Sequence, residues 1–180
     1  LAAGLFNENP IAFALGIRDT EYDVRCCQGI EYERTAAFEI IAKSGRSGVV
    51  MDAHAAWTAA TLDILDLIFS LLGPIYIPQS GRDDLLAFRG FDEFHTAPTM
   101  TLVHRNGETY RQEHTPEAIE ARNQYVSQQL EKIEKSCAVV PAIAPNQLSA
   151  LEDMILEKCG DRVMDAIFLC TGDRILISDD

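Results

Sequence analysis

The chain has 180 residues, of which 47% are hydrophobic and 24% are charged, a balance typical of a globular domain with its own core. Its formal net charge of −13 argues against non-specific nucleic-acid binding, because the phosphate backbone supplies most of that affinity electrostatically. No apolar run is long enough to span a bilayer and no signal peptide is visible, so we expect no membrane partner.

The five cysteines are odd in number and form no C-x-x-C motif, which indicates small buried thiols in a reducing cytoplasm rather than a disulfide framework or a zinc site. The chain begins at Leu1 rather than Met and stops at the end of an expected strand. We therefore expect a cytoplasmic fragment of a longer protein, whose other domains would be partners of this one.

Residues 1–47 predict a helical extension. Asn9-Pro10 suits a helix start, and residues 30–45 mix apolar positions with Glu/Arg pairs before Gly45. This segment is too short for a core of its own. We expect it to pack on a main domain at 48–180, or to be the end of an upstream helical array.

The main domain opens with the short apolar run VVMDA at 49–53, which predicts a buried strand. A helix is expected from there to Gly73, and PIYIP at 74–78 predicts a second strand. SGRDDLLAF then predicts a helix capped by Ser80.

The second half of the chain continues the alternation. Asn106-Gly107 between strand-like flanks is a strong hairpin signal, and a helix with Thr115 as its cap follows to about residue 136. The remaining elements expected are a strand at 137–141, helices at 146–159 and 161–171, and a strand at 174–178. Strands that alternate with helices predict a three-layer α/β/α sandwich with a mainly parallel central sheet, here with an inserted β-hairpin.

Acidic residues recur where these strands end. Asp52 ends the first strand, Asp83 and Asp84 follow the second, and Asp179 and Asp180 follow the last. The carboxyl ends of parallel strands are where sites form in such sheets. Carboxylates that converge there would repel one another, and a divalent cation such as Mg²⁺ or Mn²⁺, which prefers oxygen ligands, would relieve that repulsion.

Asp165 stands alone in the apolar helix segment VMDAIFLC, where an uncompensated carboxylate costs stability. The other acids have simpler interpretations as well: Asp52 as a loop or cap residue, and Asp83 and Asp84 as acids of a helix N-terminus. Asp165 is the acid least easily explained in such a way, and it is therefore the strongest indication of a site.

These segments together resemble a PIN domain. VVMDA resembles the first strand with its acid, PIYIPQSGRDDLLAF resembles the segment leading to the helix with the second acid, and DRVMDAIFLCTGDRILISDD resembles the last two acidic motifs. The resemblance covers about 48–180. The hairpin and long helix at 100–136 resemble a subgroup found beside helical repeats and transcription-elongation-factor-like C-terminal domains in large bacterial proteins.

The resemblance implies a metal-dependent ribonuclease that uses Mg²⁺ or Mn²⁺ and acts on RNA as an endoribonuclease. It implies Asp52, Asp165 and Asp180 as metal ligands, with Asp179 as an alternate for Asp180. Asp84, or else Asp83, would be the second catalytic acid. Ser178 matches the hydroxyl residue of the final motif.

Two features of the sequence depart from the PIN pattern, and two further groups of residues are candidates for contacts with the substrate. The second acid is Asp where the family commonly has Glu, so its shorter arm reaches less far. The chain also stops where the family continues, so the domain is expected to be truncated at its C-terminus. His54 would either touch a phosphate or lie exposed at a helix start. The substrate backbone would be guided by arginines, for which the candidates are Arg82, Arg89, Arg105 and Arg111.

A second function stays open. The acidic balance and the short second acid also fit a catalytically silent PIN-like module that serves as a scaffold or regulatory partner within a larger protein. Arg105 and Arg111 flank the Asn-Gly turn, so the hairpin is either a substrate arm or a plain solvated hairpin. PIN domains often pair, so a homodimer is a further possibility that no residue here marks.

Overall fold

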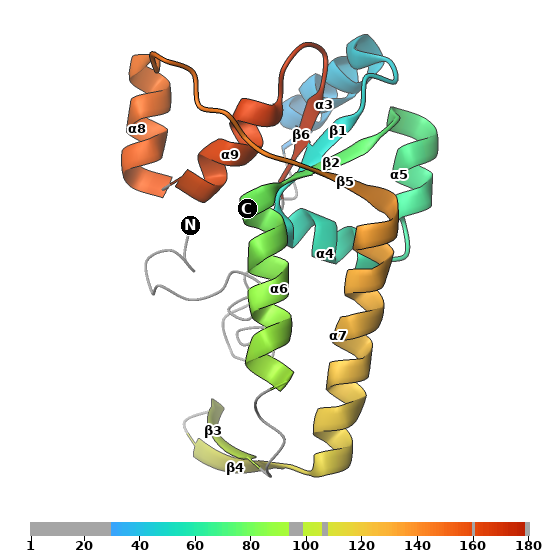
Figure 1. Cartoon of the computed structure of the whole chain (residues 1–180), viewed down its shortest axis with the longest axis vertical. Helices are drawn as coiled ribbons and strands as arrows, with labels where there is room; N and C mark the ends of the chain where they lie inside the picture. The colour runs from blue at the N-terminus through green and yellow to red at the C-terminus, as the bar shows by residue number, and fades with distance from the viewer. Residues whose placement is uncertain (1–29, 94–98, 106–107, 160, 179–180) are drawn as a thin grey trace.

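A computed structural model describes residues 30–93, 99–105, 108–159 and 161–178 of the chain. The helix expected after Asn9 lies outside these residues. The described part contains a four-stranded sheet wrapped by helices, a long helical pair, and a separate two-stranded hairpin (Figure 1).

Four parallel strands form the central sheet in the order β5-β2-β1-β6. Each is a short apolar run, and the sequence predicted each one to within a few residues. The strands are β1 (Val49–Met51), β2 (Ile75–Pro78), β5 (Cys137–Val140) and β6 (Ile175–Ile177).

The two faces of the sheet are covered by different helices, because successive side chains of a strand point to opposite sides. Val49 and Met51 pack into the larger core with α4 (Ala53–Thr61) and α7 (Pro116–Ser136). Val50 faces the other way, onto the α9 (Asp161–Leu169) residues Ala166 and Leu169. The structure thus confirms the three-layer α/β/α sandwich with a parallel sheet.

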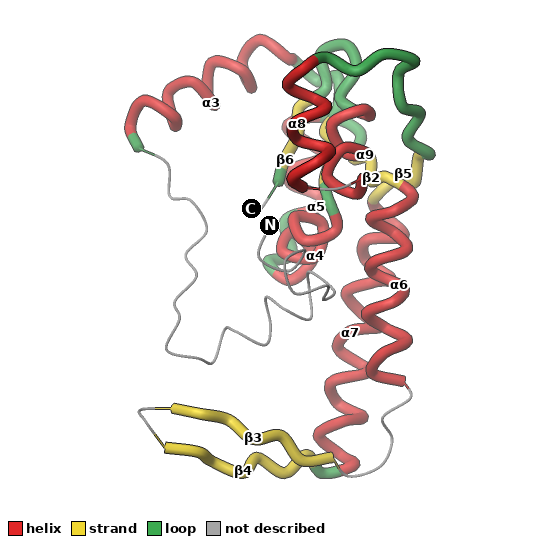
Figure 2. Tube along the Cα trace, turned by 90° about the vertical axis from the view of Figure 1, so that its left-hand side faces the viewer, coloured by secondary structure: helices red, strands yellow, loops and turns green. Residues whose placement is uncertain are grey.

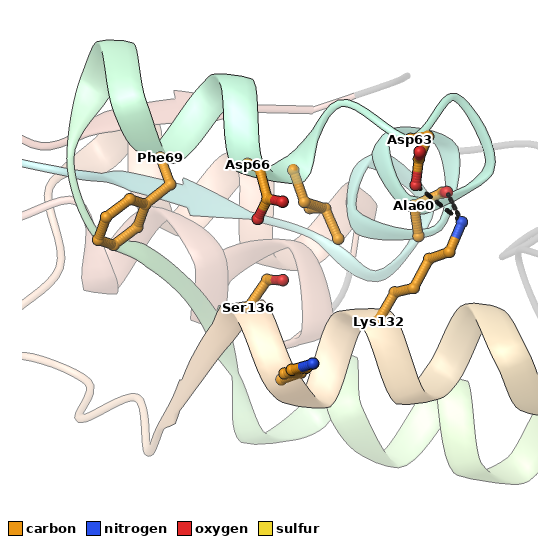
Figure 3. A pocket seen from close by; sticks show the side chains of 8 residues that line it. Ala60, Asp63, Asp66, Phe69, Lys132 and Ser136 are labelled. Atoms are coloured by element: carbon orange, nitrogen blue, oxygen red, sulfur yellow. Dashed lines mark hydrogen bonds and ion pairs between the residues drawn. The ribbon is translucent and has the colours of Figure 1, made fainter.

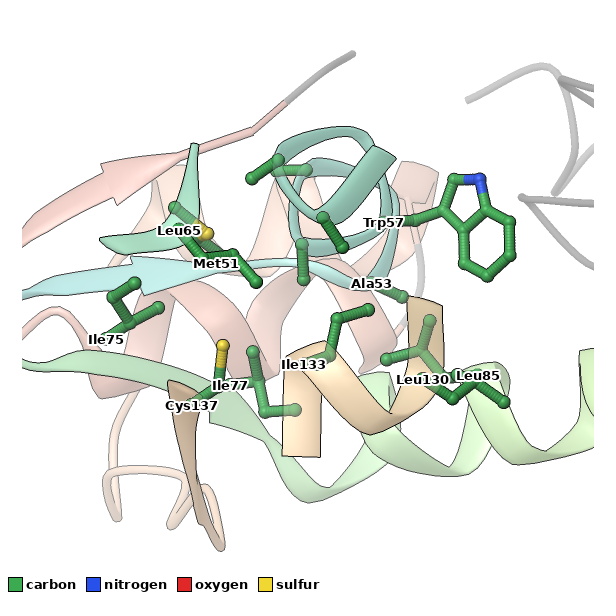
Figure 4. Packing of buried hydrophobic residues seen from close by; sticks show 14 of the residues in the cluster. Met51, Ala53, Trp57, Leu65, Ile75, Ile77, Leu85, Leu130, Ile133 and Cys137 are labelled. Carbon is green, nitrogen blue, oxygen red and sulfur yellow. The ribbon is translucent and has the colours of Figure 1, made fainter. Parts of the chain in front are cut away.

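Figure 4 shows the larger core, in which Met51, Ile75 and Ile77 of the sheet meet Leu130 and Ile133 of α7. These side chains are at most 5% exposed, so their burial supplies most of the stabilisation of this layer. Trp57 of α4 contacts Phe88 of α6 (Gln79–Glu93) edge-on, with ring centroids 5.3 Å apart. Burial in this core raises the pKa of the Cys137 thiol to about 12. Of the predicted buried thiols, Cys137 is buried and Cys170 is half-buried.

The single helix expected to run to Gly73 is wrong, because the chain breaks it after Thr61. α4 ends there, and α5 (Leu65–Leu72) begins after a turn in which Asp63 adopts a φ of 57°. The two helices are bent by 112° relative to each other. The polar spacing of Asp63, Asp66 and Ser70 suits one helix equally well, so the pattern concealed the turn.

No single described helix has both the length and the apolar composition of a membrane span; only α4 and α5 taken together, across their bend, have them.

α6 (Gln79–Glu93) begins directly after Pro78, at the carboxyl end of β2. The predicted cap at Ser80 is wrong, because the helix already includes Gln79 and Ser80 lies in its first turn. α7 packs along α6, and the predicted Thr115 cap is confirmed by its hydroxyl, which accepts a hydrogen bond from the Ala118 amide at 3.3 Å.

The predicted hairpin is confirmed as β3 (Thr99–Arg105) paired antiparallel with β4 (Glu108–His114). Asn106 and Gly107 themselves lie outside the described residues. Both views place the hairpin at the far end of α6 and α7 from the sheet (Figures 1 and 2).

Two helices flank the sheet more loosely. α8 (Ala150–Cys159) packs mainly on α9, on the side opposite the larger core. α3 (Glu31–Ser44) carries no buried residue and touches the sheet chiefly at β6. This exposure fits the expected extension, and the boundary at residues 47–48 stays a prediction.

Candidate active site at the carboxyl edge of the sheet

The carboxyl ends of β1 and β6 bring two of the predicted site residues together. Met51 pairs with Ile177 in the parallel register, so Asp52 and Ser178 are the next residues on the two neighbouring strands. The Ser178 hydroxyl donates a hydrogen bond to Asp52 Oδ2 at 2.5 Å. The strand register therefore explains why residues 126 positions apart meet at this edge.

Asp52 also begins α4 as its N-cap. Its Oδ1 accepts a hydrogen bond from the Ala55 amide at 2.7 Å, which is the usual role of an aspartate at this position. The cap interpretation of Asp52 is thus confirmed, and it is compatible with the site interpretation because Oδ2 faces Ser178. Two hydrogen bonds fix the orientation of one half-buried carboxylate.

The neighbouring acids Asp83 and Asp84 lie in different environments. Asp83 is exposed, and its Oδ1 accepts a hydrogen bond from the Gln79 side chain at 3.0 Å. The Asp84 side chain is only 6% exposed and forms an ion pair with Arg162 of α9. Of the two alternatives left open by the sequence, Asp84 is the acid that faces the interior.

The first turn of α6 approaches the start of α4 closely. A Cβ atom placed on Gly81 would lie 3.3 Å from Pro78 Cγ, a tight contact, and 3.5 Å from the Ala53 nitrogen, an ordinary one, so the two segments are neighbours. The Ser80 hydroxyl is buried beside it and has no hydrogen-bond partner among the described residues. The acids of β1 and α6 are therefore held at one corner of the molecule.

Asp165 lies in α9 between the buried residues Met164 and Ala166, and it is itself half-buried. It follows Arg162 by three positions, so the two side chains are neighbours on the helix surface. The same helix carries Arg162, the partner of Asp84. It packs on α6, β1 and β2. Asp179 and Asp180 lie outside the described residues.

The donors at this edge fit a hard divalent cation in their chemistry, since carboxylate and hydroxyl oxygens are the ligands that Mg²⁺ and Mn²⁺ prefer. Within residues 30–93, 99–105, 108–159 and 161–178, however, no three His, Cys, Asp or Glu side chains are placed to hold one ion together. Asp84 is instead neutralised by Arg162. Sequence reasoning missed Arg162, because no local spacing relates it to Asp84.

The other predicted substrate residues are dispersed. Arg82 of α6 forms an ion pair with Glu134 of α7, with 3.8 Å between the guanidinium nitrogen and the carboxylate oxygen. Arg111 in the hairpin forms one with Glu113, with 2.7 Å between the corresponding atoms. Arg105 closes β3 opposite Glu108. His54 is half-buried in the first turn of α4, rather than exposed.

A cavity of about 450 Å³ lies away from these acids, where α7 enters β5 at the amino edge of the sheet (Figure 3). Lys132 Nζ binds Asp63 Oδ1 at 2.9 Å and reaches the Ala60 carbonyl oxygen at 3.4 Å, which closes the end of α4. These contacts join the turn between α4 and α5 to α7. The cavity is separate from the acidic edge and contains none of the predicted site residues.

Comparisons with known proteins give one family. Residues 50–180 match the family described as the PIN domain associated with the TPR-GreAB-C-PIN system. No curated protein and no solved structure matches the chain. Because the match covers well over half of the chain, including all four sheet strands except the first residue of β1, the chain belongs to this family of PIN domains.

Proposed function

We propose that the chain is a metal-dependent endoribonuclease that hydrolyses phosphodiester bonds at the carboxyl edge of the sheet. The observation that carries the proposal is the hydrogen bond from Ser178 to Asp52 across the ends of β1 and β6. It places an oriented carboxylate next to the point where the chain continues into Asp179 and Asp180. Membership in the PIN family, which generally consists of nucleases, supports the same function.

Each residue has a proposed role. Asp52, Asp165 and Asp180 would hold Mg²⁺ or Mn²⁺, with Asp179 as the alternate for Asp180, and Asp84 would complete the acidic group. An ion held by these residues would activate water and stabilise the negative charge that develops on the phosphate. Ser178 orients Asp52 through its hydrogen bond, so that the carboxylate needs no rearrangement during the reaction.

The setting of the domain is part of the proposal. The family name refers to TPR and GreAB C-terminal segments, so we propose that other domains of the same longer chain are its neighbours. The net charge of −13 makes an unassisted hold on RNA weak, which gives those neighbours or the hairpin arginines a role in delivering the substrate. The cytoplasm is the proposed compartment.

The test is cleavage of a labelled RNA of mixed sequence in the presence of Mn²⁺. We expect cutting that stops when EDTA is added and leaves 5′-phosphate and 3′-hydroxyl ends. D165N should reduce the rate by about a hundredfold or more, because a lost ligand removes several kcal/mol of transition-state stabilisation.

The matched control is D153N, which removes the same charge from an exposed position of α8. It should cut like the unmodified protein. Cutting that persists in EDTA, or that D165N and D153N affect equally, would show that the activity does not come from this site.

One observation favours the second candidate function, a silent PIN module that acts through protein contacts. Asp84 is already paired with Arg162, and no three potential ligands converge within the described residues. A folded protein that cuts no RNA with either Mg²⁺ or Mn²⁺ would support this function over the nuclease.

A further inference from the structure

Arg162 lies next to two of the acids proposed for the site, Asp84 and Asp165. It is the second residue of α9, it pairs with the 6% exposed carboxylate of Asp84, and it lies one turn before Asp165 on the same helix. Arg162 therefore contacts one of the acids that are proposed to act with a divalent ion and is a helix neighbour of another.

The ion pair is unequal in its exposure. The Asp84 side chain is almost fully buried, whereas the Arg162 side chain is 66% exposed. A buried carboxylate without a partner is strongly destabilising, so some cation must accompany it. Arg162 meets that need from the solvent side, and because its side chain is 66% exposed it can leave the pair without opening the core.

We propose that Arg162 is a built-in counter-ion that competes with the divalent cation for Asp84. This inference rests on the proposed function and adds its regulation. In the described residues the Asp84 carboxylate is occupied by the Arg162 guanidinium, and no three potential ligands are placed to hold one ion together. Binding of the ion through Asp84 requires the guanidinium to withdraw, and anything that attracts Arg162 outwards, such as a substrate phosphate, favours this binding.

The competition makes a directional prediction about metal affinity. R162Q removes the competing charge, and we expect its dissociation constant for Mn²⁺ to fall about tenfold, because a charge-assisted hydrogen bond no longer has to be broken. The free ion is measured by electron paramagnetic resonance, which does not depend on RNA cleavage. In the absence of metal, R162Q should also melt at a lower temperature, and Mn²⁺ should restore it more than it does the unmodified protein.

Two controls separate this effect from the general change in charge. R46Q loses the same charge in the exposed loop before β1, at the opposite edge of the sheet, and should bind Mn²⁺ like the unmodified protein. In a D84N background, R162Q should no longer tighten Mn²⁺ binding, because the two residues act as a coupled pair. If R162Q fails to fold, R162K, which keeps the charge but loses the planar fork, replaces it and should bind Mn²⁺ more tightly than the unmodified protein.

Unchanged or weaker Mn²⁺ binding in the folded variant overturns the proposal, as does equal tightening in the D84N background. Tighter binding by R162Q without any RNA cleavage supports the competition and contradicts the nuclease. Cleavage with Mn²⁺ binding that R162Q leaves unchanged contradicts the competition and supports the nuclease. The absence of Mn²⁺ binding in every variant overturns both.

Discussion

Asp52 combines a structural and a chemical role in one side chain. Its Oδ1 caps α4 by accepting from the Ala55 amide, and its Oδ2 accepts from Ser178. A cap of this kind contributes about 1 kcal/mol to stability. The two oxygens therefore allow the two roles to be separated by substitution.

D52N and D52A should differ in stability and agree in activity. The amide oxygen of D52N can still accept from Ala55, so we expect its free energy of unfolding in urea to stay within about 0.5 kcal/mol of the original, whereas D52A should lose about 1 kcal/mol. Neither variant carries the negative charge, so both should lose RNA cleavage. If D52N retained cleavage, Asp52 would be a cap residue alone.

The acids also show what a sequence can tell at the scale of a residue. Asp83 and Asp84 are indistinguishable by type and position, yet one is exposed and the other buried, because a helix turns by 100° per residue. The pairing of Asp84 with Arg162 depends on the packing of α9 against α6. No local pattern contains that information.

At the scale of the element, the strands were predictable and one helix break was not. Each sheet strand is a short apolar run bounded by Gly, Pro or a change of pattern, as in the Gly73-Pro74 pair before β2. Local backbone hydrogen bonds close the turn at Asp63, from the Asp63 amide to the Ala60 carbonyl at 3.1 Å and from the Ile64 amide to the Ala59 carbonyl at 3.0 Å, and Lys132 of α7 contacts it from the outside. The helical spacing of the polar residues continues across this turn, so the periodicity could not reveal it.

The packing of α7 on the sheet stabilises β1, the strand that ends directly before Asp52. Ile133 is 1% exposed and belongs to the same core as Met51, the residue before Asp52. I133A should lower the free energy of unfolding by about 2–4 kcal/mol through the cavity it leaves. E131A, at an exposed position of the same helix, should change it by less than about 0.5 kcal/mol.

Urea denaturation followed by circular dichroism measures both variants. An I133A variant as stable as E131A would mean that α7 contributes little to the core. In that case the packing of α7 on β5 and α4 would not hold the sheet in place, and the carboxyl edge would need another support.

At the scale of the whole molecule, the proposed catalytic acids and the proposed RNA-binding arginines lie at opposite ends of α6. The acids lie at the carboxyl edge of the sheet, whereas Arg105 and Arg111 lie on the hairpin at the other end of α6 (Figure 2). α6 has 15 residues, which corresponds to about 22 Å at 1.5 Å per residue. A substrate that reached both places would have to extend along this helix.

The hairpin should therefore matter for long RNA and not for short RNA. R105Q/R111Q removes two positive charges at the hairpin, so we expect weaker binding and slower cleavage of a long single-stranded RNA, with a salt dependence reduced in proportion to the lost phosphate contacts. Cleavage of an oligonucleotide too short to span α6 should stay unchanged, because the acids of the sheet edge are intact. K43Q/R46Q, which removes two charges near the amino edge, is the matched control and should leave both substrates unaffected. Equal losses on long and short RNA would show that the arginines act through the fold, and no loss on either would make the hairpin a solvated connection between α6 and α7.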